Sequence, residues 1–317
     1  MGKLAGKTVL ITGSTGFVGS NLVRRSLKEG ADVHIITREN SDKWRLKDVL
    51  TDLNEYHADL TDYNRLKSVI SEVEPSIIFH LATYGGDASQ NNAQKIIESN
   101  FMGTFHLVNA SKEVGFDLLV NTSSSSEYGI KSEPMQEDDP LEPVNDYGVS
   151  KAAATLYCQS VAKRENLPLV TLRLFSPYGY YEGPDRLIPS IILSCLTDKP
   201  PQVSSPNFVR DFIFIDDVLD SYLSLVKNPP VNGEIFNIGS GKQHTIGDVV
   251  NLIIELSGYS LEPQWGREPK WSNEPLKWQA NITKAKKYLK WAPDNSLKSG
   301  LSQTWEWFLK NKELYYI

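Results

Sequence analysis

Cysteine is scarce in this sequence, with 2 among 317 residues, and long apolar runs are missing. Cys158 and Cys195 both stand in apolar stretches with helical spacing, so we expect buried thiols, as suits a reducing cytoplasm. No apolar run approaches the roughly 18 residues of a membrane-spanning helix, and the first residues lack the apolar centre of a signal peptide. We therefore expect a cytoplasmic protein without membrane association.

Positive charge is also in deficit. The 33 lysines and arginines face 39 aspartates and glutamates, and the basic residues are scattered along the chain rather than gathered in one run. Nucleic acid is therefore not expected as a partner, because binding it requires a basic surface. His80 is followed by no residue at metal-ligand spacing, so we expect a packed histidine and no metal site. The 40% hydrophobic content indicates a globular chain with one large α/β domain or two ordinary ones.

The N-terminal stretch has the pattern of a strand, a glycine turn and a helix. The apolar run Thr8–Thr12 predicts a strand, three glycines spaced by three residues follow, and helical period begins at Asn21. Such a turn brings the backbone and a helix N-terminus close to a pyrophosphate, although a glycine cluster alone is often only a turn. We predict that a dinucleotide cofactor binds here through Gly13, Ser14, Thr15, Gly16, Phe17, Val18 and Gly19.

The end of the second predicted strand, Asp32–Thr37, is where the cofactor ribose is expected. An acidic residue there selects NAD by accepting hydrogen bonds from the 2′-hydroxyl, whereas a cation suits the 2′-phosphate of NADP. The chain has Thr37 followed by Arg38, which favours NADP(H) over NAD(H). Glu39 could fold back and reverse this preference, and Arg38 could be an ordinary solvated charge.

Strands and helices alternate from residue 8 onward, which predicts a parallel, doubly wound α/β sheet. Sheets of this kind bind ligands at the carboxyl ends of their strands. Asp59 follows the third unit of the alternation, and Thr83 begins a glycine-containing turn after the strand Ser76–Ala82. Further cofactor contacts are expected at these strand ends, from Asp59, Leu60, Leu81, Ala82 and Thr83.

A serine-rich strand end and a Tyr-x-x-x-Lys pair come next. The four serines Ser123–Ser126 directly follow the predicted strand Asp117–Thr122. Tyr147 and Lys151 stand four residues apart at the start of a predicted helix, so they share one helical face. The pKa of tyrosine is near 10 and must fall by about three units to reach neutral pH, which corresponds to roughly 4 kcal/mol. One lysine charge about 4 Å away supplies an interaction energy of that order. By itself, however, the pair could equally be a solvated surface pair.

Several motifs occur together in one order. They are Thr12-Gly13-x-x-Gly16-x-x-Gly19, Asn100-x-x-Gly103-Thr104, the serine strand end, Tyr147-x-x-x-Lys151, Leu172–Gly179, Arg210-Asp211-Phe212-Ile213-x-x-Asp216-Asp217 and Phe236–Gly239. With them the chain resembles, over essentially its whole length, the extended short-chain dehydrogenase/reductase family, in the branch that modifies nucleotide sugars. The resemblance implies a Rossmann-type NAD(P)-binding domain of residues 1–175 plus 208–238 and a smaller, discontinuous nucleotide-sugar-binding domain of residues 176–207 plus 239–317.

The resemblance also implies roles for single residues. Tyr147 would be the acid/base at the sugar C4 oxygen, and Lys151 would lower its pKa and hold the nicotinamide ribose. Ser124, or else its neighbour Ser125, would hydrogen-bond the same oxygen. Asn100 would join the cofactor contacts, and a nucleoside-diphosphate sugar would be held by Tyr84, Ser125, Ser126, Ser176, Arg210 and Arg267. The two arginines would neutralise the diphosphate, unless they form surface salt bridges. A homodimer is expected through helices 96–114 and 148–164.

Departures from the family pattern narrow the implied reaction. The sugar 4,6-dehydratases carry an acid and a base directly after the active hydroxyl, where this chain has Ser125-Ser126 and places Glu127 one residue too late. The 4-epimerases usually carry an acidic residue where Thr37 stands. We therefore expect an NADPH-dependent reductase of the 4-keto group of a nucleoside-diphosphate 4-keto-6-deoxyhexose, with Tyr147 as acid/base. The alternative is a 4-epimerase, similar to UDP-glucose 4-epimerase, with tightly bound NAD. A 4,6-dehydratase and a non-catalytic NAD(P)-binding protein are further alternatives.

Overall fold

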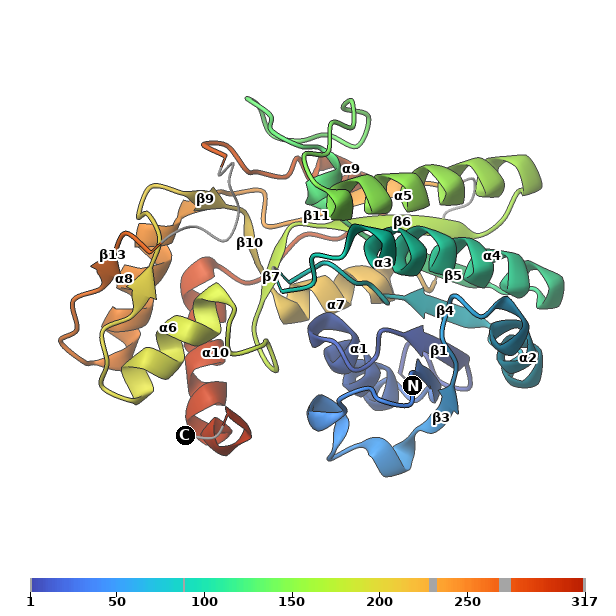
Figure 1. The fold of residues 1–317 in the computed structure, drawn as a ribbon, viewed down its shortest axis with the longest axis horizontal. Coiled ribbons are helices and arrows are strands. Elements are labelled where there is room, and N and C mark those ends of the chain that lie inside the picture. Colours follow the sequence, from blue (N-terminus) through green and yellow to red (C-terminus); the bar gives the residue numbers. More distant parts are fainter. Residues whose placement is uncertain (1, 88, 228–232, 268–274, 316–317) are drawn as a thin grey trace.

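The computed structural model of the chain describes residues 2–87, 89–227, 233–267 and 275–315 (Figure 1). Its centre is a seven-stranded parallel sheet in the order β11-β6-β5-β4-β1-β2-β3. The strands are β1 (Thr8–Thr12), β2 (Asp32–Thr37), β3 (Asn54–His57), β4 (Ile77–His80), β5 (Leu118–Ser124), β6 (Leu169–Leu174) and β11 (Ile235–Ile238). The strand order reverses between β1 and β4, the kind of switch point where doubly wound sheets bind ligands. The predicted α/β fold is confirmed.

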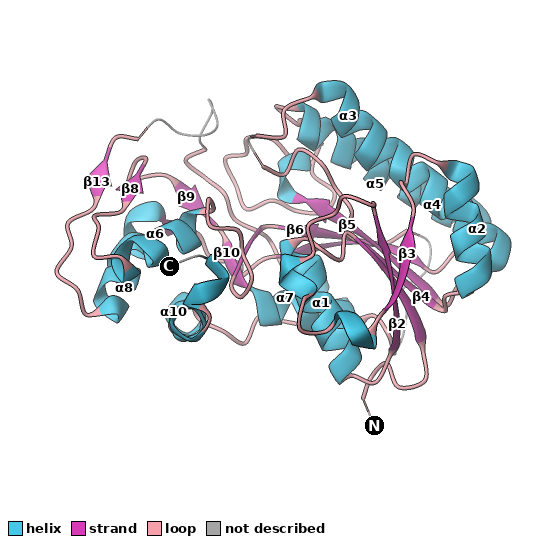
Figure 2. Cartoon of the chain, turned by 60° about the horizontal axis from the view of Figure 1, so that its bottom comes forward, coloured by secondary structure: helices cyan, strands magenta, loops and turns pink. Residues whose placement is uncertain are grey.

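Helices cover both faces of the sheet (Figure 2). On one face lie α2 (Tyr63–Val73), α4 (Gly103–Val114) and α5 (Asp146–Glu165), and on the other α1 (Phe17–Lys28) and α7 (Ile215–Ser224). In β1, Leu10 packs into the core beneath α2 and α4, while Val9 and Ile11 pack into the core that includes α1 and α7. Both sides of the strand are buried, which explains its continuous apolar sequence.

A smaller lobe lies at the carboxyl ends of the sheet strands (Figure 1). Its helices are α6 (Leu187–Leu196), α8 (Ile246–Ser257) and α10 (Leu297–Lys310). Three strand pairs belong to this region: β7 (Ser176–Tyr178) with β10 (Phe212–Phe214), β9 (Val209–Arg210) with β12 (His244–Thr245), and β8 (Gln202–Val203) with β13 (Gln264–Trp265). The lobe therefore draws on separate segments of the chain, and the exact domain boundaries stay a prediction.

Several shorter helices complete the chain. They are α9 (Thr283–Tyr288), which packs beside β11, and the turns η1 (Trp44–Leu46), η2 (Leu50–Asp52), η4 (Ser125–Glu127) and η5 (Lys312–Tyr315). The prediction of one helix from Ile96 to Val114 was wrong in that the helix is interrupted. The structure has α3 (Ala93–Ile97), then the π-helical turn η3 (Glu98–Met102), then α4. A π turn rotates the side chains that follow it and is frequent at functional sites; here it carries the buried Asn100.

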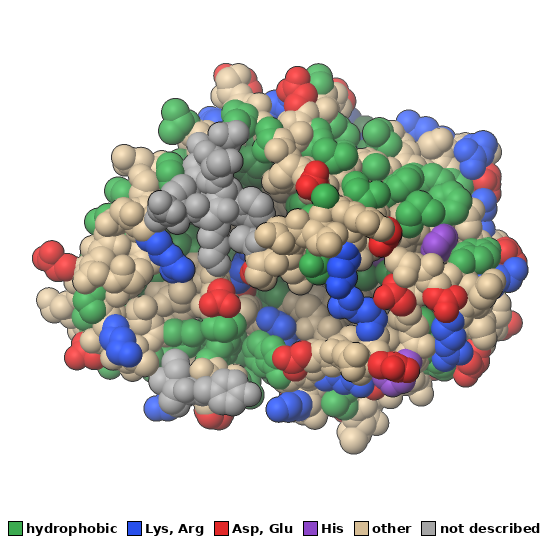
Figure 3. Space-filling view, in the orientation of Figure 1, with side chains coloured by type: hydrophobic (Ala, Val, Ile, Leu, Met, Phe, Trp, Pro, Cys, Tyr) green, Lys and Arg blue, Asp and Glu red, His purple; other side chains and the backbone are tan. Residues whose placement is uncertain are grey.

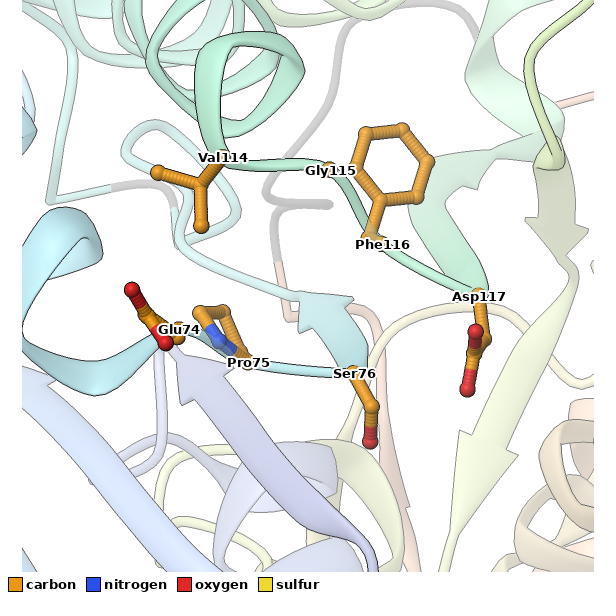
Figure 4. A pocket seen from close by; sticks show the side chains of 7 residues that line it. All are labelled: Glu74, Pro75, Ser76, Val114, Gly115, Phe116 and Asp117. Atoms are coloured by element: carbon orange, nitrogen blue, oxygen red, sulfur yellow. The ribbon is translucent and has the colours of Figure 1, made fainter.

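A hollow, shown from close by in Figure 4, lies at the amino ends of the sheet strands, whereas the smaller lobe lies at their carboxyl ends (Figure 1). It is lined by Glu74, Pro75, Ser76, Val114, Gly115, Phe116 and Asp117, at the amino ends of β4 and β5. The Lys7 ammonium pairs with the Asp117 carboxylate at 2.8 Å. Because sheets of this type bind ligands at the carboxyl ends of their strands, this hollow is not the candidate active site.

The cysteines and His80 are placed as the sequence indicated. Cys158 and Cys195 are buried free thiols. The ring nitrogens of His80 lie 2.7 Å from the Thr12 hydroxyl and 2.9 Å from the Thr104 hydroxyl, and burial lowers the pKa of His80 to about 3, so the ring is neutral at physiological pH. Within the described residues, no helix is long and apolar enough to span a membrane, and no group of His, Cys, Asp or Glu side chains could hold a metal ion.

Candidate active site

Close backbone contacts shape the glycine turn after β1. Gly13 has a φ of +68°, and a Cβ there would lie 2.5 Å from the backbone nitrogen of Ala82. A Cβ at Gly19 would lie 2.1 Å from the Gly13 carbonyl oxygen, so the first turn of α1 packs directly on the loop. Neither position accepts a side chain without displacement of the backbone. Among the described residues the buried Ser14 hydroxyl has no hydrogen-bond partner, which suits a phosphate oxygen of a bound dinucleotide.

The end of β2 carries an acidic neighbour that the sequence did not reveal. The Thr37 hydroxyl donates to Glu55 Oε1 at 2.5 Å, and Lys43 Nζ lies 2.5 Å from the same oxygen. Partial burial acts to raise the pKa of Glu55, but the bonds from Lys43 and Thr37 hold it below its ordinary value. Arg38 is exposed. Glu55 belongs to β3, so inspection of β2 and the residues after it could not find this carboxylate.

The other predicted cofactor contacts lie at neighbouring strand ends. Asp59 accepts hydrogen bonds from the N–H and hydroxyl of Thr61 at 2.9 and 2.7 Å. Partial burial acts to raise the pKa of Asp59, but these bonds hold it below its ordinary value. The same edge of the sheet carries Leu60, Leu81 and Ala82.

Asn100 ties the end of β4 to helix α5. Its Oδ1 accepts from the Thr83 hydroxyl at 3.1 Å and from the Tyr84 N–H at 2.7 Å. Its Nδ2 donates to the Tyr84 carbonyl at 2.8 Å and to Ser150 Oγ at 2.9 Å. Ser150 directly precedes Lys151, so the π turn, the strand end and the helix that carries the candidate catalytic pair are fixed relative to one another.

Ser124 and Tyr147 lie near one another in the structure. Ser124 ends β5, and Tyr147 lies in the first turn of α5, whose cap Asn145 accepts from the Gly148 N–H at 2.8 Å. Burial raises the pKa of Tyr147 above its ordinary value, and the nearby hydroxyls of Ser124 and Thr83 oppose that rise. The phenol is therefore protonated at neutral pH in this arrangement.

Lys151 shares the helical face of Tyr147, yet its ammonium bonds elsewhere. Its Nζ donates to the Thr122 carbonyl at 2.6 Å, and the residue is 3% exposed. Burial lowers the pKa of Lys151 to about 8, while the Glu127 carboxylate acts to raise it. Among the charges that act on Tyr147, that of Arg186 lowers its pKa and that of Glu127 raises it. The lowering of the tyrosine pKa by Lys151 stays a prediction, and the ammonium bonds the backbone of β5 in this structure.

A glycine pair closes one side of the site. Gly85 has a φ of +90°, and a Cβ there would lie 2.8 Å from Ile96 Cγ1 and 3.5 Å from the Tyr147 ring. Arg186, in the loop before α6, donates to the Gly86 carbonyl at 3.1 Å. The smaller lobe therefore reaches the loop beside Tyr147. The sequence had given Arg186 no role, because nothing in its spacing indicates this contact.

The serine run is divided by the turn η4. The Ser126 N–H donates to Ser124 Oγ at 3.1 Å, which keeps both serines near the end of β5. Glu127 is instead buried in the core, where it accepts hydrogen bonds from the hydroxyls of Ser123 and Thr155 and from Arg173 Nε. Its carboxylate is engaged there and is not offered to a ligand at Ser124.

Ser125 and Arg210 both meet Trp278. The indole Nε1 donates to Ser125 Oγ at 3.2 Å, and the Arg210 guanidinium carbon lies 5.8 Å from the centre of the indole ring. The buried Asp211 carboxylate fixes this region by accepting from the N–H groups of Ser240, Gly241 and Ala280. Trp278 was missed by sequence reasoning, since 153 positions separate it from Ser125.

Two predicted substrate residues lie farther out. Ser176 begins β7, and its N–H donates to the Asp211 carbonyl at 3.0 Å. Arg267 follows β13, at the outer end of the smaller lobe (Figure 2), where it is exposed and its N–H donates to the Val203 carbonyl at 3.1 Å. The described contacts therefore do not bring Arg267 to the serine and tyrosine cluster, and its role at a diphosphate stays a prediction.

Known proteins are similar to this chain in sequence and in fold. The model of the NAD dependent epimerase/dehydratase family matches residues 9–239. The chain belongs to this family. UDP-glucuronate 4-epimerase of Thermodesulfobacterium geofontis is 31% identical over 317 residues, which cover 96% of this chain and 97% of that protein. dTDP-glucose 4,6-dehydratase of Neisseria meningitidis is 26% identical, with 96% and 94% covered. The resemblance drawn from the motifs is confirmed.

Solved structures of the epimerase/dehydratase family superpose on nearly the whole chain. UDP-glucose 4-epimerase of Thermotoga maritima with UDP-glucose has a TM-score of 0.88 and 26% identity, covering 96% of this chain and 99% of its own. UDP-glucuronic acid 4-epimerase of Bacillus cereus, in complex with UDP-glucuronic acid and NAD, has a TM-score of 0.84 and 27% identity, covering 95% and 99%. Use of a nicotinamide cofactor follows from the family, whereas the expected preference for NADP(H) finds no support in these relatives.

Proposed function

We propose that this protein is an NAD-dependent 4-epimerase of a UDP-linked sugar, rather than the 4-keto reductase that the sequence alone favoured. The observation that carries the proposal is the meeting of Ser124 with Tyr147, and of Lys151 with the end of β5, at the strand ends next to the glycine turn. Its support from comparison is that 4-epimerases of UDP-glucose and UDP-glucuronic acid match almost the whole chain.

In a 4-epimerase the C4–H bond breaks and forms again on the opposite face of the sugar. When bound, the nicotinamide supplies a reversible acceptor for that hydride. Tyr147 takes the proton of the C4 hydroxyl in the first half of the reaction and returns it to the 4-keto oxygen in the second, so there is no net oxidation. Ser124 donates a hydrogen bond to the same oxygen.

Lys151 has the donors to support this exchange. An ammonium carries three N–H groups, and the Thr122 carbonyl occupies one of them. The other two serve the ribose hydroxyls of the cofactor and bring positive charge toward Tyr147. That charge lowers the pKa of the phenol when the sugar and cofactor are bound and water is excluded.

The serine turn favours epimerisation over dehydration. A 4,6-dehydratase of this family needs an acid and a base beside the active hydroxyl. Ser125 and Ser126 occupy those places, and neither hydroxyl is acidic enough to replace a carboxyl. Glu127 cannot substitute for them, because its carboxylate is bonded within the core to Arg173 and Thr155. The chemistry therefore stays at C4.

Glu55 is the observation that favours NAD. Its carboxylate stands beside Thr37 at the end of β2, held there by the Thr37 hydroxyl and by Lys43. A carboxylate at this strand end accepts hydrogen bonds from ribose hydroxyls and repels a 2′-phosphate. Glu55→Gln is therefore expected to weaken NAD binding and to strengthen NADP binding in fluorescence titrations. An unchanged ratio of the two affinities contradicts this part of the proposal.

The smaller domain is assigned to the nucleotide. Arg210 approaches the face of Trp278, and Trp278 in turn bonds Ser125, next to the active hydroxyl. A sugar diphosphate fits this order, with its diphosphate at Arg210 and its sugar between Trp278 and Tyr147. Tyr84, Ser126, Ser176 and Arg267 remain the further substrate contacts of the proposal.

A cytoplasmic homodimer completes the proposal. On the outer face of α4 and α5, Leu156 is 54% exposed and Val149 44%, and the rings of Phe105 and Tyr157 pack 5.0 Å apart. Figure 3 shows apolar side chains gathered over these helices. Two such faces pair readily, since antiparallel helices bury apolar stripes of this kind. A dimeric mass in light scattering, converted to monomer by Leu156→Glu, is the expected result.

Product analysis separates the epimerase from the reductase. The purified protein, without added cofactor, is incubated with UDP-glucose and with UDP-glucuronic acid, and C4 epimers are resolved by chromatography. Denaturation of the same sample should release NAD. Tyr147→Phe is the matched control and should form no epimer. Consumption of NADPH with a 4-keto-6-deoxy sugar nucleotide, with no epimer formed from either UDP-sugar, would instead establish the reductase.

A further inference from the structure

Glu127 is the centre of a buried charge cluster beneath the proposed active site. The side chains of Glu127 and Arg173 are 0% and 2% exposed. One carboxylate oxygen, Oε1, accepts from the hydroxyls of Ser123 and Thr155, and the other, Oε2, accepts from Arg173 Nε at 2.6 Å. These donors lie on β5, α5 and β6. A single carboxylate therefore joins the strand and the helix that carry the catalytic groups.

The partners of Glu127 are neighbours of those catalytic groups. Ser123 directly precedes Ser124 at the end of β5. Thr155 follows Lys151 by four residues on α5, so the two side chains share a helical face. The carboxylate thus fixes the spacing between the end of β5 and α5 on the core side, while the Tyr147 phenol approaches Ser124 on the other side of the strand end.

The negative charge of Glu127 also links this cluster to Lys151. The Arg173 guanidinium stays protonated at all physiological pH values, so removal of Glu127 would leave that buried cation without its carboxylate partner. The titratable groups that act on Lys151 or feel its charge are Glu127, Cys158 on α5 and His80 on β4, and Tyr147 stands one helical turn before it. His80 is neutral, and burial raises the pKa of the Cys158 thiol. Of this set, Glu127 alone brings negative charge to Lys151 at neutral pH.

We propose that Glu127 is a positioning residue that keeps Lys151 protonated inside the buried site and holds β5 and α5 at their working distance. The inference rests on the proposed function, in which the Lys151 cation supports Tyr147. Glu127 has its contacts in the core. Its own charge acts to raise the pKa of Tyr147, so its support of the tyrosine passes through Lys151. In this proposal the buried ion pair of Glu127 and Arg173 supports the active site and does more than balance charge in the core.

The test reads the protonation of Lys151 without turnover. The rate of its acetylation by acetic anhydride is measured against pH by mass spectrometry of the peptide that contains it, with exposed lysines of the same sample as standards. In Glu127→Gln the midpoint of the pH dependence should fall by about one to two pH units, the order expected when one nearby buried elementary charge is removed at an effective dielectric constant of about 20. Glu127→Asp keeps the charge and should restore most of the midpoint.

Thr155→Val is the matched control, because it removes a hydrogen bond from Glu127 but no charge. It should lower stability and leave the midpoint unchanged. An unchanged midpoint in folded, NAD-binding Glu127→Gln, or an equal fall in Thr155→Val, overturns the proposal. If Glu127→Gln does not fold, the double variant with Arg173→Gln removes both charges, and a smaller fall is expected there; no fall refutes the inference. Failure of the epimerase assay refutes the proposed function separately, since the acetylation measurement needs no substrate.

Discussion

Replacing Glu182 with glutamine should make the protein more stable at alkaline pH. Glu182 is 5% exposed and lies in the loop between β7 and α6, where the smaller lobe meets the glycine turn. Arg45, in η1, joins that loop to the turn by donating to the carbonyls of Tyr181 at 2.6 Å and Thr15 at 3.3 Å. Glu182 Oε1 lies 3.8 Å from Arg186 Nε, and Oε2 has no hydrogen-bond partner in the part of the chain that the structure describes.

The size of the effect follows from the pKa of this carboxyl. Burial raises the pKa of Glu182 from 4.5 to about 7, and the Arg186 charge opposes the rise only in part. Because the pKa is higher in the folded state, the group contributes stability that is complete below pH 4.5 and is lost as the pH rises to about 7. The difference between the two pKa values corresponds to about 3 kcal/mol of the free energy of unfolding. Glutamine has a similar shape and no proton to lose, so the variant avoids the loss.

Denaturant unfolding at pH 5 and pH 8 tests this reasoning. At pH 5 the variant and the wild type should differ by less than about 1 kcal/mol, and at pH 8 Glu182→Gln should be more stable by about 3 kcal/mol, or about 6 °C in melting temperature for a chain of this size. Glu306→Gln, at an exposed position of α10, is the control and should show no such dependence on pH. A gain of equal size at both pH values refutes the reasoning, because the effect would then not depend on ionisation of Glu182. A loss of stability at pH 8 also refutes it, because the carboxylate would then be ionised and paired in the folded protein.

Three further predictions concern the proposed site. Tyr147→Phe should lower kcat by about 10²- to 10⁴-fold with NAD binding retained, as measured by epimer formation and fluorescence titration; undiminished turnover would remove Tyr147 as the acid/base. Gly13→Ala sets a methyl group 2.5 Å from the Ala82 nitrogen and should abolish co-purifying NAD and lower the melting temperature, whereas normal cofactor content would contradict the fit of the turn. Arg210→Ala should raise KM for the UDP-sugar at least about tenfold and change kcat less, since it removes a charge-assisted contact; an unaltered KM would exclude Arg210 from the diphosphate site.

The parts of the site that the sequence predicted depend on local periodicity. The glycine spacing places Gly13 and Gly19 in one turn whatever the rest of the chain does, and the structure shows the backbone contacts that require them. Tyr147 and Lys151 share a face because residues four apart do so on any helix. The alternation of strands and helices implies a parallel sheet, which brings strand ends such as Thr83 and Ser124 to one edge. Each of these inferences needs only a short window of sequence.

The parts that were missed depend on pairing between distant segments. Glu55 stands beside Thr37 because β3 pairs with β2 in one particular register. Trp278 reaches Ser125 only after the smaller lobe folds back on the sheet. The π turn places Asn100 against the end of β4, although its sequence gives no sign of an interrupted helix. The predicted preference for NADP(H) rested on Thr37 and Arg38 at the end of β2, whereas the Glu55 carboxylate beside Thr37 belongs to the neighbouring strand β3.

The four serines show how such pairing assigns chemistry to identical residues. Side chains alternate along a strand, so Ser123 faces the core and bonds Glu127, while Ser124 faces the ligand edge and meets Tyr147. The turn η4 then ends the alternation, and Ser125 reaches Trp278 in the smaller lobe. Position in the run therefore gives the first three hydroxyls different partners: Glu127 in the core for Ser123, Tyr147 for Ser124 and Trp278 for Ser125. This arrangement supports the proposed epimerisation, because the only carboxylate of the segment, that of Glu127, is bonded in the core to Thr155 and Arg173 and leaves hydroxyls beside Tyr147.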